Sequence, residues 1–339
     1  MDRVILDWPN LGFHVRETDI NVRCHYRDGE WGPLEFSDNH NLTIPMAATA
    51  LHYGQSIFEG LKAFETVDGR VAIFRPDENA ARMQYGARKL LMEAPSTSLF
   101  LEAVSELVRQ NRRFVPPAGS GAALYLRPLL FGTSPLLGVR PAKEFTFCMF
   151  ATPVGPYFRS VLSPIRLRVE RESHRAAPLG VGDVKAAGNY AASMRSVGAA
   201  KHAGFDNVLY LDARESRYID ETGATNFFGI QSGDHHRYVT PRSNSILASI
   251  TNKSLMTIAD DLGYLVEHRP IAVDELSSFD EAGACGTAAV ITPIQEIVDS
   301  SGTYGYVAPG PVTRQLYDRL TGIQAGVMED THGWVHYVD

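Results

Sequence analysis

The sequence has few cysteines and no long apolar run. Its 339 residues include three cysteines that lie far apart, and no Cys-x-x-Cys pair occurs. Such a sparse set does not form a disulfide framework and lacks the thiolate spacing of a zinc site. The longest apolar stretches, such as residues 122–126, are far shorter than the roughly 20 residues of a membrane-spanning helix. We therefore expect a reducing compartment and no membrane partner.

Positive charge is not in excess either. The formal net charge is −7, so no broad basic field is available to bind nucleic acid. The first ten residues, MDRVILDWPN, carry acids where a secretory signal has basic and then apolar residues. Aromatic residues make up 10% of the chain, which argues against a disordered protein. Composition thus predicts a cytoplasmic α/β enzyme that acts on a small molecule.

Several familiar catalytic motifs are also missing. Gly180-Val-Gly182 begins like a dinucleotide-binding loop, but Lys185 stands where a third glycine is needed, and no P-loop Gly-Lys-Ser/Thr follows. No Gly-x-Ser-x-Gly nucleophile elbow occurs. His332 and His336 have helical spacing but no obvious third ligand, so we expect no metal site. These absences count against a nicotinamide-dependent dehydrogenase, a P-loop enzyme and a serine hydrolase.

The length predicts about two domains. Buried strands and amphipathic helices are expected in both halves of the chain. Asp77 and Ser249 are candidate N-caps, and Gly263 is a candidate helix stop. The expected strands are 71–75, 122–131, 144–152, 165–169, 207–211 and 226–230, and the expected helices are 77–92, 98–114, one from 250 and one from 311. We predict two α+β domains, residues 1–155 and 171–339, joined by a linker over 156–170 that begins in a proline-containing stretch.

Lys185 is the residue whose surroundings point most directly to chemistry. It lies among Gly, Ala and Val residues, with Asp183 as the nearby acid. The ordinary interpretation is a surface lysine. An amine in an apolar pocket, however, loses proton affinity and attacks carbonyl groups, which is Schiff-base chemistry.

A pyridoxal cofactor on such a lysine would need a carboxylate at its ring nitrogen and donors for its phosphate. Glu221 precedes a Gly-Ala-Thr-Asn turn and a buried strand, although a plain turn residue is the alternative. Ile250 and Thr251 open a helix whose N-terminus suits an anion, although capping by Ser249 alone would also explain the pattern. The small-residue turn at Thr287 could equally be the start of a packed strand.

Seven segments in order along the chain together resemble the branched-chain amino-acid aminotransferases, which are fold-type IV pyridoxal-phosphate enzymes. The segments are LHYGQSIFEGLKAF (51–64), FRPDENAARM (74–83), LYLRPLLFG (124–132), VKAAGNYAAS (184–193), DETGATNFFG (220–229), SNSILASITNKSL (243–255) and GTAAVITP (286–293). The resemblance implies a two-domain α+β fold of the D-amino-acid-aminotransferase type. A smaller N-terminal α/β domain and a larger C-terminal cofactor-binding domain would hold pyridoxal 5′-phosphate in the cleft between them.

The resemblance also implies roles for individual residues. Lys185 would hold the cofactor and move a proton between the substrate and the cofactor, and Glu221 would contact the ring nitrogen. Tyr190 would lie beside the O3′ hydroxyl. The residues expected around the phosphate are Arg82, Ile250, Thr251 and Thr287.

The substrate pocket implied by the resemblance is aromatic, with an arginine for the distal carboxylate of glutamate or 2-oxoglutarate. That arginine is Arg127, and the backbone N–H of Ala288 would lie near the substrate α-carboxylate. Leu137 and Val139 would reach into the site of a second subunit, which implies a homodimer with shared active sites. The aromatic walls would be Phe13, Tyr53, Phe58 and Tyr125.

The function that follows is a transaminase that moves the amino group of L-leucine, L-isoleucine or L-valine to 2-oxoglutarate by ping-pong kinetics. Alternatives on the same fold are a D-amino-acid aminotransferase, an aminodeoxychorismate lyase or an inactive cofactor-binding paralogue. Some family members have threonine where this chain has Ala224, which leaves the finer substrate preference open. Others carry a redox cysteine pair where this chain has Ala289 and Thr292, so we expect no thiol control there.

Overall fold

A computed structural model of the chain describes residues 2–155 and 162–338. The chain divides into two compact α+β units. The first comprises Met1–Tyr157, Val184–Ala187 and Gly322–Asp339, and the second comprises Phe158–Asp183 and Gly188–Thr321. Of the predicted linker, residues 156–161 lie outside the described residues, and Ile165–Glu170 form strand β9. The domain boundaries at 155 and 171 stay a prediction, because this division also assigns two later segments to the first unit.

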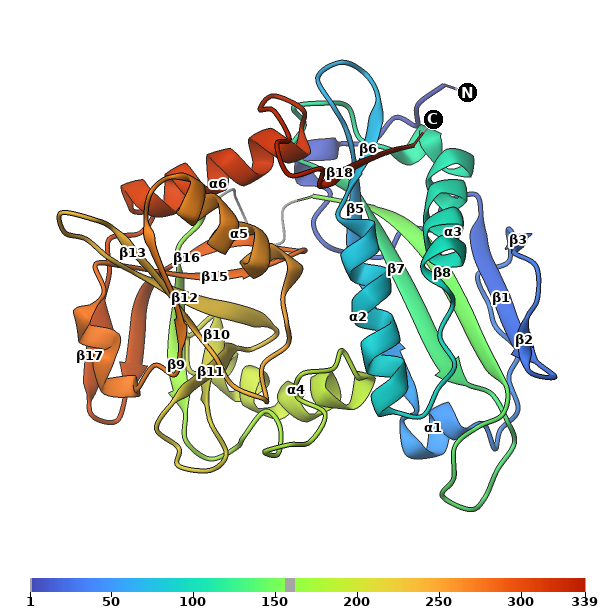
Figure 1. Ribbon diagram of the computed structural model, residues 1–339, viewed down its shortest axis with the longest axis horizontal. Helices are drawn as coiled ribbons and strands as arrows, with labels where there is room; N and C mark the ends of the chain where they lie inside the picture. The colour runs from blue at the N-terminus through green and yellow to red at the C-terminus, as the bar shows by residue number, and fades with distance from the viewer. Residues whose placement is uncertain (1, 156–161, 339) are drawn as a thin grey trace. The chain divides into compact units, whose positions relative to one another are not determined.

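The first unit is built on one sheet. Among the described residues it has nine strands, in the order β18-β6-β5-β7-β8-β1-β2, with β3 beside β1 and β4 beside β7 (Figure 1). The long hairpin of β7 and β8 pairs Ala123 with Val154 and Gly132 with Phe145. The strands are β1 (Asn21–Arg27), β2 (Glu30–Trp31), β3 (Glu35–Ser37), β4 (Ser56–Phe58), β5 (Leu61–Glu65), β6 (Val71–Phe74), β7 (Ala123–Gly132), β8 (Phe145–Val154) and β18 (Val335–Val338).

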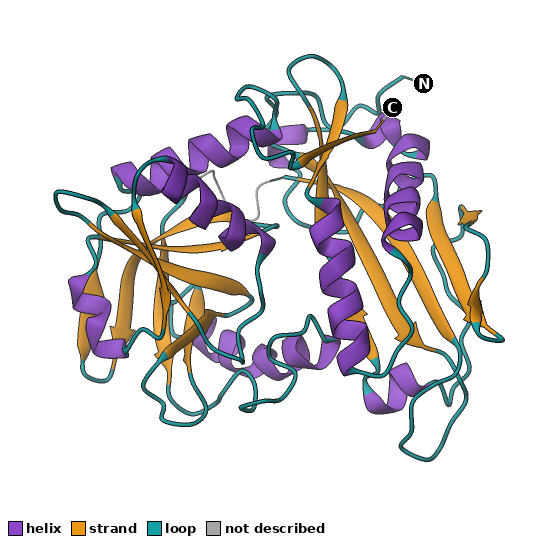
Figure 2. Ribbon diagram, in the orientation of Figure 1, coloured by secondary structure: helices purple, strands orange, loops and turns teal. Residues whose placement is uncertain are grey.

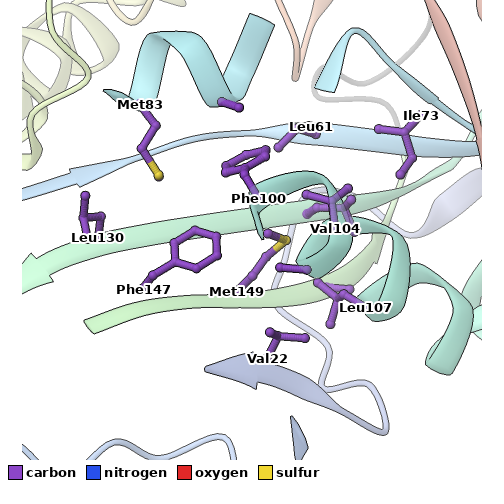
Figure 3. Close-up of a cluster of buried hydrophobic side chains, with 14 of the residues drawn as sticks. Val22, Leu61, Ile73, Met83, Phe100, Val104, Leu107, Leu130, Phe147 and Met149 are labelled. Carbon is purple, nitrogen blue, oxygen red and sulfur yellow. The ribbon is translucent and has the colours of Figure 1, made fainter. Parts of the chain in front are cut away.

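Helices α2 (Pro76–Lys89) and α3 (Thr97–Gln110) pack against this sheet and bury the core of the unit. Both helices carry an apolar stripe at 3.6-residue spacing, which gives them a face to bury. Figure 3 shows side chains from α2, α3 and the strands packed together, with Phe100 and Phe147 at 5.8 Å between ring centroids. A short helix, α1 (Thr49–Tyr53), precedes β4.

The structure corrects the predicted ends of these two helices. Asp77 is not the N-cap of α2, because the helix already begins at Pro76, whose fixed φ suits the first helical position. Asp77 instead lies in the first turn, where its charge favours the helix dipole. Helix α3 ends at Gln110 rather than near Phe114, because the Asn111 side chain donates to the Leu107 carbonyl oxygen at 2.8 Å and competes with the helix.

The second unit contains a sheet that closes on itself. Strands β11, β10, β9, β16, β15 and β12 follow one another, and β11 also pairs with β12, so these six described strands form a ring. Strands β13, β14 and β17 extend it (Figure 2). The strands are β9 (Ile165–Glu170), β10 (Asn207–Leu211), β11 (Ile219–Thr222), β12 (Thr225–Gln231), β13 (Arg237–Pro241), β14 (Leu265–Arg269), β15 (Glu281–Gly286), β16 (Val290–Asp299) and β17 (Gly302–Gly305).

Three longer helices belong mainly to the second unit: α4 (Ala187–His202), α5 (Ile250–Asp261) and α6 (Pro311–Gln324). The predicted start of α5 is confirmed, because the Ser249 hydroxyl accepts a hydrogen bond from the Asn252 N–H at 3.2 Å. Gly263 follows its end with φ of +78°, a conformation that glycine adopts without strain. Within the described residues, no helix combines the length and apolarity needed to cross a membrane.

Candidate active site

Lys185 is held against β4 of the first unit by its own backbone. The Lys185 carbonyl oxygen accepts a hydrogen bond from the Phe58 N–H at 3.1 Å, and Ala186 forms a bridge with Ile57. The neighbours Val184 and Ala186 are buried in the hydrophobic core of the unit, which fixes the segment on both sides of the lysine. The Lys185 Nζ atom then lies 4.6 Å from the centroid of the Phe58 ring. Local apolar residues thus anchor the backbone and leave one amine as the reactive group.

The surroundings of this amine favour its neutral form. Burial lowers the pKa of Lys185 to about 8, the nearby guanidiniums of Arg82 and Arg127 lower it further, and Glu59 and Tyr125 oppose the shift. Desolvation penalises the ammonium, and the neutral amine is the nucleophile. The structure therefore places at position 185 the kind of amine that Schiff-base chemistry needs.

Beside Lys185, a buried acid holds the predicted phosphate ligand Arg82. The Glu59 carboxylate accepts hydrogen bonds from Arg82 Nε at 2.8 Å and Arg82 Nη2 at 2.7 Å, and Glu59 is only 1% exposed. Asn79, one turn before Arg82 on α2, donates to the same carboxylate at 2.7 Å. Charge-assisted, two-pronged pairing of this kind fixes the plane of a guanidinium. The role of Arg82 toward a phosphate stays a prediction.

Glu59 was missed in the sequence analysis. A usable signal was present, since this glutamate interrupts an otherwise apolar stretch between Ile57 and Ala63. A charge in such a stretch is buried only with a partner of opposite sign. The partner, Arg82, lies on a different element, so the sequence alone did not name it.

Four predicted pocket residues lie together in the first unit. The rings of Phe13 and Tyr125 meet edge to face at 5.2 Å between centroids, and Arg127 Nη2 donates to the Tyr125 hydroxyl at 3.1 Å. The Arg127 guanidinium carbon lies 4.8 Å from the centroid of the Phe58 ring. Arg127 Nε is buried and finds no hydrogen-bond acceptor in the part of the chain that the structure describes. A buried donor without an acceptor fits a carboxylate ligand.

Gly60 makes room for this cluster. A Cβ atom at position 60 would lie 2.2 Å from the Tyr125 hydroxyl oxygen, closer than such atoms approach. The tyrosine hydroxyl that accepts from Arg127 therefore depends on the absence of a side chain at this position, directly before β5.

Tyr53, Leu137 and Val139 form a separate group in the first unit. The Tyr53 hydroxyl donates to the Leu137 carbonyl oxygen, which ties the loop to the end of α1. The side chains of Leu137 and Val139 are 85% and 86% exposed. The structure thus joins these three predicted residues to one another and leaves two apolar side chains in solvent.

The second unit holds the remaining predicted residues. Glu221, on β11, is 3% exposed, and its Oε1 atom accepts from the Leu247 N–H at 2.6 Å. Arg175 Nη2 lies 3.3 Å from the same oxygen. A backbone donor and a guanidinium both favour the ionised carboxylate, as contact with a pyridine nitrogen requires.

Donors for an anion are present in the same unit. Ile250 and Thr251 are the buried first residues of α5, where the helix dipole favours negative charge. Thr287 and Ala288 form the half-buried turn between β15 and β16, and Tyr190 is half-buried on α4. Among the described residues, no cluster of histidine, cysteine and acidic side chains could bind a metal ion. These residues fit a phosphorylated aromatic cofactor: a reactive amine, a fixed carboxylate and a helix N-terminus.

Comparisons with known proteins agree with this chemistry. The family profile described as Amino-transferase class IV matches residues 56–297. The branched-chain-amino-acid aminotransferase of Helicobacter pylori (strain J99) is 45% identical over 335 residues, covering 98% of each chain. The chain therefore belongs to the class IV aminotransferases, and within them to the branched-chain amino-acid aminotransferases.

Solved structures give the same result for the fold. The Escherichia coli branched-chain amino acid aminotransferase superposes with a TM-score of 0.80 at 27% identity, covering 95% of this chain and 100% of that one. The branched-chain amino acid aminotransferase of T.th. with pyridoxamine 5′-phosphate gives 0.77 at 28% identity, covering 95% and 99%. The predicted family and its fold-type IV architecture are thereby confirmed, and the chain is a pyridoxal-phosphate-dependent transaminase.

Proposed function

We propose that this chain transfers the amino group of L-leucine, L-isoleucine or L-valine to 2-oxoglutarate, with pyridoxal 5′-phosphate as its cofactor. The observation that carries the proposal is the buried Lys185 amine, which shares the Phe58 ring with Arg127, an arginine whose buried Nε lacks an acceptor among the described residues. One cluster thus offers a nucleophilic amine and a carboxylate-binding cation on apolar walls. Family membership supports the reaction type and the branched substrates.

When bound, the cofactor would supply an electron sink for negative charge at the substrate α-carbon. Lys185 would hold the cofactor through Nζ and, once released, would move the proton at the substrate α-carbon. Glu221 would accept the hydrogen bond of the ring nitrogen, and Tyr190 would donate to O3′. The groups proposed for the phosphate are Arg82, Ile250, Thr251 and Thr287.

The substrate pocket must hold an apolar branched side chain in one half-reaction and a glutamate side chain in the other. Phe13, Phe58 and Tyr125 supply apolar walls, and Arg127 supplies one cation at their edge. An apolar pocket binds the first side chain, and a two-pronged arginine binds the second. We assign Ala288 N–H to the α-carboxylate.

We also propose a cytoplasmic homodimer with shared active sites. Leu137 and Val139 place two nearly fully exposed apolar side chains on one loop that Tyr53 ties down. Exposed apolar groups on an anchored loop are typical of an interface. The second copy of the chain would receive these side chains beside its own pocket.

The visible absorption of the purified protein with pyridoxal 5′-phosphate tests the proposal. L-leucine should remove the band of the lysine-bound cofactor, and 2-oxoglutarate should restore it. D-alanine serves as the control substrate. A band that responds to D-alanine but not to L-leucine would instead indicate a D-amino-acid aminotransferase, and a band that never forms would refute the role of Lys185.

A further inference from the structure

Arg175 is a buried arginine of the second unit that no part of the proposed reaction uses. It is 7% exposed, and its guanidinium contacts groups from three separate segments. Nη2 lies 3.3 Å from Glu221 Oε1, donates to the Gly182 carbonyl oxygen at 2.5 Å, and also donates to the Ser245 carbonyl oxygen. One side chain therefore joins an acid and two loops.

Each of these segments leads to a residue proposed to hold the cofactor. Glu221 is the carboxylate for the ring nitrogen. Gly182 stands three residues before Lys185, and Ser245 lies in the loop that enters α5, where Ile250 begins the phosphate-binding helix end. Arg175 is thus connected to the two segments that lead toward Lys185 and α5, and directly to Glu221.

The two loops approach each other too closely to leave room for a side chain. A Cβ atom at position 182 would lie 2.4 Å from the Ser245 carbonyl oxygen, so glycine is required there. Both carbonyl oxygens then face the same guanidinium. A neutral side chain of similar size cannot donate to two carbonyl oxygens and also neutralise the carboxylate beside them.

Stability alone does not account for this arrangement. A buried arginine costs several kcal/mol of desolvation, and a buried ion pair is often no better for folding than apolar residues of similar volume. Arg175 Nε is buried without a hydrogen-bond partner in the described part of the chain. A residue selected only for packing would not leave such a donor, so the charge itself is the useful feature.

We propose that Arg175 is a positioning residue of the transamination reaction, which acts by keeping the Glu221 carboxylate ionised and aligned with the segments that lead to Lys185 and to α5. The inference rests on the proposed function, because Glu221 matters in this way only toward a bound pyridine ring. Removing the guanidinium should weaken cofactor binding and slow the leucine half-reaction.

The test compares Arg175→Lys and Arg175→Gln with the unaltered protein. Arg171 offers a matched control, since it pairs with Asp299 at 2.7 Å in the same unit but contacts none of the proposed cofactor residues in this way. The measurements are the dissociation constant of the apoprotein for pyridoxal 5′-phosphate, the absorption maximum of the bound cofactor, and the single-turnover rate with L-leucine. Circular dichroism of each apoprotein reports folding.

We expect Arg175→Gln to raise the dissociation constant and lower the half-reaction rate by about tenfold or more each, the loss typical of a charged hydrogen bond. Arg175→Lys should recover part of both, because it keeps the charge but not the planar donors. Arg171→Gln should leave both within about twofold. A changed absorption maximum in the Arg175 variants alone would mark an effect on the ring.

A double-variant cycle with Glu221→Gln decides whether Arg175 acts through Glu221. In that background, Arg175→Gln should add less than about threefold. Full additivity, or single-variant values within about twofold of the unaltered protein, would overturn the inference. If Arg175→Gln does not fold, Arg175→Lys carries the same comparison. Failure of the unaltered protein to bind the cofactor or respond to leucine would refute the proposed function instead.

Discussion

At the scale of single residues, Lys185 illustrates how surroundings turn an ordinary side chain into a reactive one. Its amine is buried, faces the Phe58 ring and shares its neighbourhood with two arginines. Burial and the two positive charges oppose the ammonium form. The acid that partly balances them, Glu59, is committed to Arg82 by two hydrogen bonds.

Lys185→Ala should abolish transamination while the protein still folds. Loss of the group that moves the proton should lower the turnover number by at least about a thousandfold. The assay is leucine-dependent glutamate formation, with thermal unfolding measured alongside. Lys201→Ala is the control, because Lys201 is an exposed lysine on α4. Turnover near the unaltered value in the Lys185 variant would exclude the mechanism.

The depressed pKa of Lys185 predicts a pH dependence. The reactive form is the neutral amine, which predominates above the pKa of about 8 instead of above the ordinary 10.5. The rate at which the apoprotein binds pyridoxal 5′-phosphate should therefore rise toward pH 8 and level off above it. Stopped-flow absorbance measures this rate, and a simple lysine derivative in the same buffers is the control. A rate still rising steeply well above the pKa of about 8 would contradict the prediction.

At the scale of elements, helix α2 is fitted closely to the segment that carries the lysine. Gly86 faces Val184, and a Cβ atom at position 86 would lie 2.8 Å from Val184 Cγ1. Farther along the same helix, Arg82 and Asn79 are held by Glu59 from the turn after β4. The helix thus positions the Lys185 backbone by packing and the Arg82 guanidinium by charge.

Gly86→Ala should therefore destabilise the protein although alanine is the better helix former. Overpacking against the buried Val184 should cost about 1–3 kcal/mol and should also weaken cofactor binding. Gly198→Ala in α4 is the matched control, because no atom outside its local helix backbone lies within 4 Å of the added Cβ. It should gain about 0.5–1 kcal/mol from helix propensity. Urea unfolding of both apoproteins measures the difference, and equal stabilisation would disprove the close packing.

At the scale of the whole molecule, the proposed homodimer depends on the exposed loop that contains Leu137 and Val139. A double change to aspartate, Leu137→Asp with Val139→Asp, should shift the protein toward monomers and reduce activity, because charges would replace the apolar contact. Light scattering after gel filtration measures the assembly. Val327→Asp is the control, since Val327 is 65% exposed outside this loop. An unchanged, fully active dimer would exclude this loop as the interface.

The sequence by itself predicted most of the regular elements of the core. Strands β6, β7 and β8 and helices α2, α3, α5 and α6 follow from local apolar periodicity, and the start of α5 follows from its Ser249 cap. It did not predict α4, whose many small residues form no apolar stripe, or the end of α3 at Asn111. Local pattern fails where a helix lacks one buried face, or where a side chain bonds the backbone in place of the next helical turn.

The sequence also determined the reactive lysine and the family, because small residues around one amine and seven ordered segments are local features. Only the tertiary structure decided which charges accompany them. Glu59 with Arg82, and Arg175 with Glu221, are partners on different elements. Electrostatic interaction depends on distance in space and on burial, which the order of residues does not reveal. The sequence therefore determines which reactive groups this protein has, and the fold determines the charges that control them.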